Sequence, residues 1–111
     1  MRGLFIDPGE LRTELALEAA VAVADGLGGH AESWTEVATV FARIEPVSAN
    51  AVFGADQTLE TVTHRITMRW RSEVASGMRL ARPGRIFDIV TVHDPDETGR
   101  YLVCRTREIG S

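Results

Sequence analysis

The sequence predicts a single mainly β domain, either a small antiparallel β-barrel or a sandwich, with a long loop that has room for a short helix. Several short segments place apolar side chains at every second position, which is the period of a β-strand, and turns rich in glycine and proline separate them. The 111 residues, 44% of them hydrophobic, suffice for one core and not for two. We therefore expect one domain over residues 1–111, with flexible ends at 1–8 and 109–111.

The segment from Leu11 to Ala24 is the first element, and its leucine, glutamate and alanine have good helix propensity. Its periodicity favours a strand instead, because helical spacing from Leu11 reaches Leu15 and then the charged Glu18. The apolar residues at alternate positions are Leu15, Leu17, Ala19, Val21 and Val23.

A glycine-rich stretch, residues 25–29, follows and predicts a hairpin loop. The return strand runs from about Ser33 to Glu45, antiparallel to the first, and Pro46 ends it. This strand has apolar residues on both faces, so we expect one face to contact the core and the other to contact another surface.

The remaining chain contains one ambiguous segment and four further strands. Residues 48–58 form either a short helix capped by Ser48 or a mobile loop, in which Phe53 anchors the loop on the core or docks on a partner. The clearest strand is Val62 to Arg71, with one apolar face (Val62, His64, Ile66, Met68, Trp70) and one polar face (Thr63, Arg65, Thr67, Arg69, Arg71). Three short strands are expected at Met78 to Ala81, Arg85 to His93 and Tyr101 to Arg107.

No constellation of catalytic residues emerges from the sequence, so we expect no enzyme, cofactor or metal site. The three histidines lack a ligand spacing, and His64 lies on the apolar face of its strand, which favours a half-buried, hydrogen-bonded side chain. His93 with the acids that follow it loosely suggests a cation site, but a solvated turn is favoured because the calcium-loop spacing is absent. Cys104, in a predicted strand, is expected to be a small buried hydrophobe.

The charge balance, 12 basic against 16 acidic residues, gives a formal net charge of −4, which disfavours tight general binding to DNA. A single cysteine excludes an internal disulfide. The N-terminal apolar run is too short for a signal peptide, and no segment of roughly 18 apolar residues follows. We expect a soluble protein without a membrane partner, made in the cytoplasm.

Four motifs follow one another along the chain. In Glu32 to Pro46 an aromatic residue precedes a V-A-T-V-type run that closes with an acid and a proline. Thr63 to Arg69 has the form of a T-H-R-I-x-I-R strand, Gly84 to Ile89 that of a G-R-x-F-x-I strand, and Asp94 to Glu97 that of an acidic loop. In this order the motifs resemble the head-tail connector, or head-closure (stopper), family of tailed phages and gene transfer agents. The N-terminal region departs from the basic strand of typical phage members and is closer to gene transfer agent versions.

The resemblance implies a structural protein of the head-tail junction of a virion or phage-like particle. It implies a ring of copies, six- or twelvefold, that joins the portal or its adaptor to a tail terminator or tail-tube protein and closes the DNA channel. DNA would pass without sequence-specific binding. The candidate channel-loop residues are Asn50, Asp56, Gln57, Asp94, Asp96 and Glu97.

Arginine and aromatic residues are the candidates for contact with partners. Arginines two or four positions apart on a strand project the same way and can meet carboxylates or phosphates, although a solvated face paired with neighbouring acids is the default. The candidate interface residues are Trp34, Phe53, Arg65, Arg69, Trp70, Arg71 and Tyr101. An alternative function, a small β-barrel nucleic-acid-binding module, would use the same arginines with Trp34 and Trp70 as a stacking surface.

Overall fold

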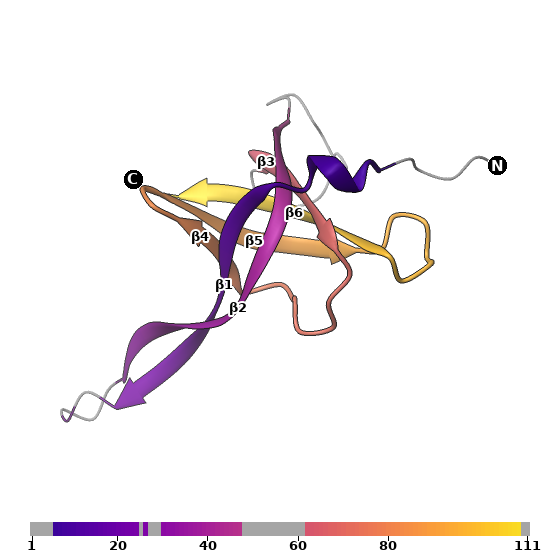
Figure 1. The fold of residues 1–111 in the computed structure, drawn as a ribbon. Coiled ribbons are helices and arrows are strands. Elements are labelled where there is room, and N and C mark those ends of the chain that lie inside the picture. Colours follow the sequence, from indigo (N-terminus) through magenta and orange to yellow (C-terminus); the bar gives the residue numbers. More distant parts are fainter. Residues whose placement is uncertain (1–5, 25, 27–29, 48–61, 110–111) are drawn as a thin grey trace, which may run out of the picture.

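A computed structural model describes residues 6–24, 26, 30–47 and 62–109 of the chain (Figure 1). A short 3₁₀ helix precedes six strands: η1 (Pro8–Glu10), β1 (Thr13–Ala24), β2 (His30–Pro46), β3 (His64–Arg69), β4 (Arg79–Arg82), β5 (Arg85–His93) and β6 (Tyr101–Ile109). The strands close into a barrel in the order β1-β2-β3-β6-β5-β4, with every neighbouring pair antiparallel. The mainly β prediction is confirmed, and the barrel is the architecture adopted.

The first strand forms where alternation rather than helix propensity predicts it. Leu15 and Leu17 lie in the core, whereas Glu14, near the start of the strand, is exposed. β1 pairs with β2 over its whole length. Long-range pairing and burial of one face outweigh the modest helix preference of alanine and glutamate.

The core fills the barrel with side chains from all six strands. Phe87 of β5 is its largest member, and Cys104 and Thr106 of β6 are fully buried beside it. The core cluster consists of Leu15, Leu17, Val40, Ala42, Ile66, Met68, Val74, Leu80, Phe87, Ile89, Leu102 and Cys104. Cys104 is therefore the small buried hydrophobe that the sequence predicts.

The predicted strand from Val62 to Arg71 is shorter in the structure, and its faces are less distinct. Trp70, expected on the apolar face, lies beyond the end of β3 and is 45% exposed, because pairing with β6 ends at Arg69. Thr67, expected on the polar face, is buried. Ile6 from the N-terminal segment and Val103 of β6 lie around it on the outside of the barrel.

The turn between β4 and β5 consists of Pro83 and Gly84, as the sequence predicts. Arg82 pairs with Arg85, which leaves two residues in the loop, and Gly84 has a φ of 78°. Proline followed by a glycine with positive φ is the pattern of a type II turn.

One predicted segment cannot be compared with the structure. Residues 48–58, the predicted helix or loop, lie outside the described residues. The first described element, η1, begins at Pro8, and the last, β6, ends at Ile109. Within the part described, no helix has the length and apolar character needed to cross a bilayer.

Candidate interaction surfaces

The hairpin of β1 and β2 extends beyond the barrel as a two-stranded ribbon. β1 pairs with β4 only over Ala16 to Glu18, and β2 pairs with β3 only over Ala42 to Pro46. The outer part of the hairpin, residues 19–24 of β1 and 30–36 of β2, is called the arm below. Figure 1 shows it projecting from the barrel, at the opposite end of the molecule from η1.

A β-bulge marks the junction between the barrel and the arm. Leu17 pairs with Ala38 whereas Glu18 pairs with Glu36, so Val37 is the extra residue on β2. Bulges bend a strand and increase its twist, which turns the arm away from the barrel wall. Val37 is exposed on the surface.

Trp34, a predicted interface residue, lies in the arm and stacks against its own chain. The Arg79 guanidinium lies 4.2 Å from the centroid of the Trp34 ring, and Arg79 Nε donates to Glu18 Oε1 over 2.6 Å. This cation–π contact and ion pair fix the base of the arm to β4. Trp34 therefore keeps only part of its surface for contact with another molecule.

A groove runs beside the point where β2 separates from β3. Phe41, 53% exposed, stands in its wall, and Arg69 and Arg71 come from the end of β3 and the residues after it. Arg71 pairs with Glu73 at 2.9 Å, whereas Arg69 makes no ion pair with any described residue. The groove, called the β2 groove below, is lined by Pro8, Leu11, Thr39, Val40, Phe41, Met68, Arg69 and Arg71.

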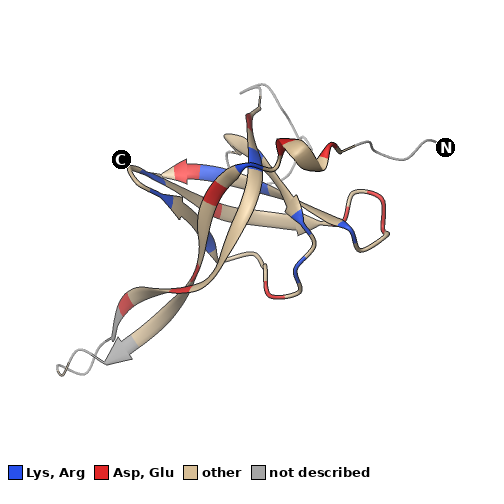
Figure 2. Ribbon diagram, in the orientation of Figure 1, with Lys and Arg blue, Asp and Glu red and all other residues tan. Residues whose placement is uncertain are grey.

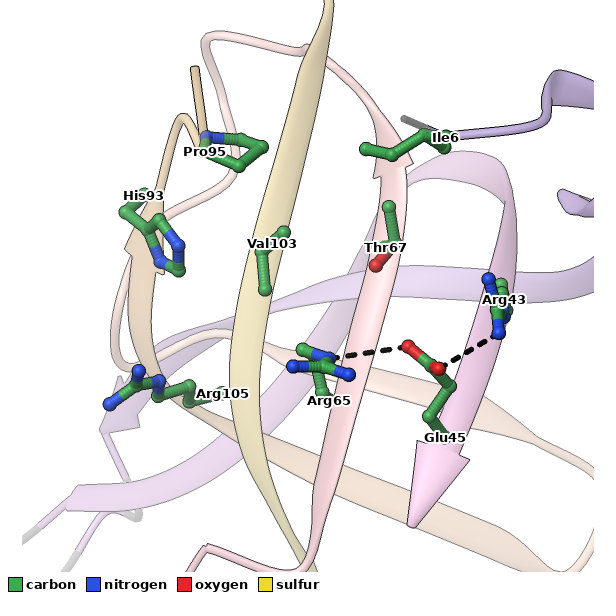
Figure 3. A pocket seen from close by; sticks show the side chains of 9 residues that line it. All are labelled: Ile6, Arg43, Glu45, Arg65, Thr67, His93, Pro95, Val103 and Arg105. Atoms are coloured by element: carbon green, nitrogen blue, oxygen red, sulfur yellow. Dashed lines mark hydrogen bonds and ion pairs between the residues drawn. The ribbon is translucent and has the colours of Figure 1, made fainter. Parts of the chain in front are cut away.

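Arg65 lies in a different hollow, so the predicted arginine stripe is divided. Figure 3 shows Arg65 beside Glu45, whose carboxylate also faces Arg43. Arg43 Nη2 lies 2.9 Å from one Glu45 oxygen, and Arg65 Nε donates to the other over 3.2 Å. Arg105 and His93 line the same hollow from β6 and β5. Arg65 thus belongs to a charged face whose members pair with one another.

Basic and acidic residues are interspersed along the described strands, as Figure 2 shows. Tyr101, another predicted interface residue, is only 9% exposed and packs against the barrel. Phe53, Asn50, Asp56 and Gln57 lie outside the described residues.

The histidine and the cysteine that were considered for a chemical role are buried or half-buried and make structural contacts. His64 is half-buried, packs edge-on against Phe87 with ring centroids 5.2 Å apart, and shares a hydrogen bond of 2.9 Å with Thr63. Arg85 donates two hydrogen bonds to Glu108, which hold the pKa of that carboxyl below its ordinary value. Burial raises the pKa of the Cys104 thiol to about 12, so it is not a thiolate at neutral pH.

The acidic turn between β5 and β6 uses its carboxylates to hold its own backbone. Asp94 Oδ1 accepts from the amides of Asp96 (3.3 Å) and Glu97 (2.8 Å), and Oδ2 accepts from that of Gly99 (2.6 Å). Asp96 accepts from Thr98 and from Arg100. Glu97 and Gly99 have positive φ angles. The described residues contain no group of three or more His, Cys, Asp or Glu that could hold a metal ion.

Sequence reasoning did not single out Phe41, Val37 and Val21, which with Trp70 are the exposed large apolar side chains among the described residues. The signal was present, because apolar residues on both faces of the second strand predicted contact with a second surface. Alternation alone could not tell which of them the barrel would leave uncovered.

These features define a class of protein, a small structural β-barrel whose uncovered apolar residues and open strand edges are suited to contacts with other subunits. The comparisons with known proteins are more specific. The model of the phage head completion protein family matches residues 6–109, and the chain belongs to this family. It is therefore a structural protein of a virion or phage-like particle.

Two solved structures are similar to the chain. One, from the virion of a native gene transfer agent particle, is 33% identical with a TM-score of 0.65, over 91% of this chain and 97% of that chain. The other, a protein of Shigella flexneri 2a solved in solution, is 25% identical with a TM-score of 0.65, over 91% and 96%. No curated protein matches the chain. The resemblance stated from the sequence motifs is confirmed at the level of the family.

Proposed function

We propose that the chain forms a ring at the head-tail junction, where it joins the portal or its adaptor to the first tail protein and closes the DNA channel. The observation that carries the proposal is the match of the head completion family over residues 6–109. The likeness to a chain of a gene transfer agent virion supports it. The function is geometric rather than catalytic, in keeping with side chains that are engaged in packing and ion pairs.

The charge of the chain suits a channel through which DNA must slide. The formal net charge is −4, and the acidic turn of Asp94, Asp96 and Glu97 is held in one conformation by its own hydrogen bonds. An acidic or neutral lining repels phosphate and does not retain DNA by electrostatic attraction. We place this turn at the lumen of the ring.

The nucleic-acid-binding alternative requires one basic surface with aromatic side chains for stacking. In the described part of the chain, Arg65 pairs with Glu45 in one hollow while Arg69 lines another, and Trp34 stacks on Arg79. This division favours the connector role. Tight, salt-dependent binding of the purified protein to single-stranded DNA would instead favour the alternative.

Deletion of the gene tests the proposal in particles. We expect particles that lack this protein to package DNA and then to lose it or to fail to acquire tails, with both defects restored by the wild-type gene in trans. Nuclease-resistant DNA per capsid measures retention, and electron microscopy of purified particles counts tails. Tailed particles that keep their DNA without the protein would overturn the proposal.

A further inference from the structure

The apolar face of β1 that packs in the core continues along the strand beyond the barrel. Leu15 and Leu17 point into the barrel, and two-residue periodicity places Ala19 and Val21 on the same side of the strand. Val21 is 42% exposed, because the barrel does not extend under the arm. Its partner across the hairpin is Ser33, so this face of the arm carries no charge at the described positions.

The backbone of the arm is also uncovered. Residues 19–24 of β1 pair only with β2 among the described residues, and they are alanine and valine without a charge or a proline. Natural proteins protect such edges with charges, prolines or covering segments, because an open apolar edge recruits another strand. A two-stranded ribbon is itself only marginally stable in water. These properties indicate that another chain covers the arm in the assembled state.

The β2 groove offers a matching surface elsewhere on the same molecule. Leu11 and Met68 are buried and form its floor, and half-exposed Phe41 supplies the accessible apolar surface beside them. β2 pairs with β3 only from Ala42 onward, so the preceding residues of β2 present an open edge toward the groove. Pro8, at the start of η1, also lines the groove, and η1 and the arm lie at opposite ends of the molecule (Figure 1).

The charges of the two surfaces are complementary. Glu32 pairs with Ala22 and so lies on the face of the arm opposite Val21, where it is exposed and has no side-chain partner among the described residues. Arg69 at the groove is exposed and makes no ion pair with a described residue. Opposite charges at the edges of an interface steer the partners and set their register.

We propose that the arm of one copy of this chain enters the β2 groove of the next copy, with Val21 on one face against Phe41 of β2 and Glu32 on the other face beside Arg69 at the end of β3. The contact joins two different surfaces, so it is heterologous, and repetition by rotation closes a ring. The inference rests on the proposed function, because it names the contact by which the ring forms.

Disulfide trapping in assembled particles tests this contact. Each copy that carries both Val21→Cys and Phe41→Cys has one new cysteine on its arm and one in its groove. Mild oxidation should therefore link neighbouring copies and produce a ladder of multimers on a non-reducing gel. Cys104 is buried and does not compete. The matched control combines Val21→Cys with Thr91→Cys, an exposed position on β5 away from the groove, and should remain monomeric. Particles that contain the Val21/Phe41 variant but yield only monomers would overturn the inference.

Charge exchange decides the question even where the cysteine variant fails to assemble. Glu32→Arg and Arg69→Glu should each reduce the amount of protein per particle by roughly tenfold, and the combined variant should restore it. As a control for folding, the purified variants should have the same thermal unfolding temperature as the wild type. Wild-type incorporation of both single variants would contradict the inference, while loss of DNA from particles without the protein would still support the proposed function.

Discussion

Two phenylalanines in opposite environments allow folding and assembly to be tested separately. Phe87 is fully buried at the centre of the barrel, with His64 edge-on to its ring and the Arg85 guanidinium 4.9 Å from its centroid. Phe41 stands on the surface beside the β2 groove, 53% exposed. We consider Phe41→Ala, with Phe87→Leu as a variant matched in stability and Phe87→Ala as a reference for core damage.

The expected magnitudes follow from burial. A phenylalanine offers about 200 Å² of surface, of which roughly half is covered at Phe41, so its loss costs at most about 2.5 kcal/mol at about 25 cal/mol per Å². Phe87→Leu should cost about 2 kcal/mol, since it leaves a small cavity, and Phe87→Ala about 3–5 kcal/mol. An aromatic interface anchor contributes about 2 kcal/mol or more per contact, roughly a thirtyfold loss of affinity.

The assay compares the stability of the purified variants with their behaviour in particles. Urea denaturation should give similar losses for Phe41→Ala and Phe87→Leu. Incorporation, measured by immunoblot against the capsid protein, should fall strongly for Phe41→Ala and remain near wild type for Phe87→Leu, because the proposed contact uses the exposed Phe41 and not the buried Phe87. Nuclease-resistant DNA per particle should follow incorporation.

Two results would refute this reasoning. If Phe41→Ala enters particles as well as Phe87→Leu does, the exposed ring is not an interface anchor. If Phe41→Ala loses as much stability as Phe87→Ala, the ring supports the fold rather than a contact between copies.

Four further expectations concern individual contacts. Thr106→Val removes a buried hydroxyl that donates to a β3 carbonyl over 3.0 Å, and urea denaturation should show a loss of about 1 kcal/mol. Asp94→Ala removes the acceptor of three turn amides, so hydrogen exchange should accelerate in that turn and not in the core of β6. Arg85 holds the pKa of Glu108 below its ordinary 4.5, so the stabilisation is complete above pH 4.5 and is lost as the pH falls through the lower folded-state value. Acid titrations of unfolding should therefore be flatter for Glu108→Gln. The thiol of Cys104, with a pKa raised to about 12, should resist a disulfide reagent at about pH 8 until the chain is unfolded.

Local periodicity was enough to predict most strands, because the side chains of a strand alternate whatever surrounds it. The segment of Leu15 and Leu17 was assigned correctly on this basis, against its helix propensity. The bounds of β5 were also predicted, since Pro83 and Gly84 at one end and the acidic turn after His93 at the other interrupt any strand. Turn chemistry and alternation are properties of neighbouring residues, which the sequence displays directly.

Burial of particular residues could not be predicted in this way. Tyr101 and Thr67 belong to outward-facing positions of β6 and β3 but are buried, whereas Trp70 is exposed because β3 ends before it. Ile6 and Pro95, which line the hollow beside Thr67, come from opposite ends of the chain, and no local pattern predicts that they meet. The ion pair of Arg65 with Glu45 likewise depends on the register of β2 against β3.

The arm shows most clearly which features follow from the sequence and which depend on the tertiary structure. The sequence determined that Leu15, Leu17, Ala19 and Val21 share one face, because alternation is set by the backbone of a single strand. Only the tertiary structure decided where along that stripe the core ends, because β4 pairs with β1 as far as Glu18 and closes the barrel there. Residues of one pattern thus become core on one side of that boundary and uncovered surface on the other.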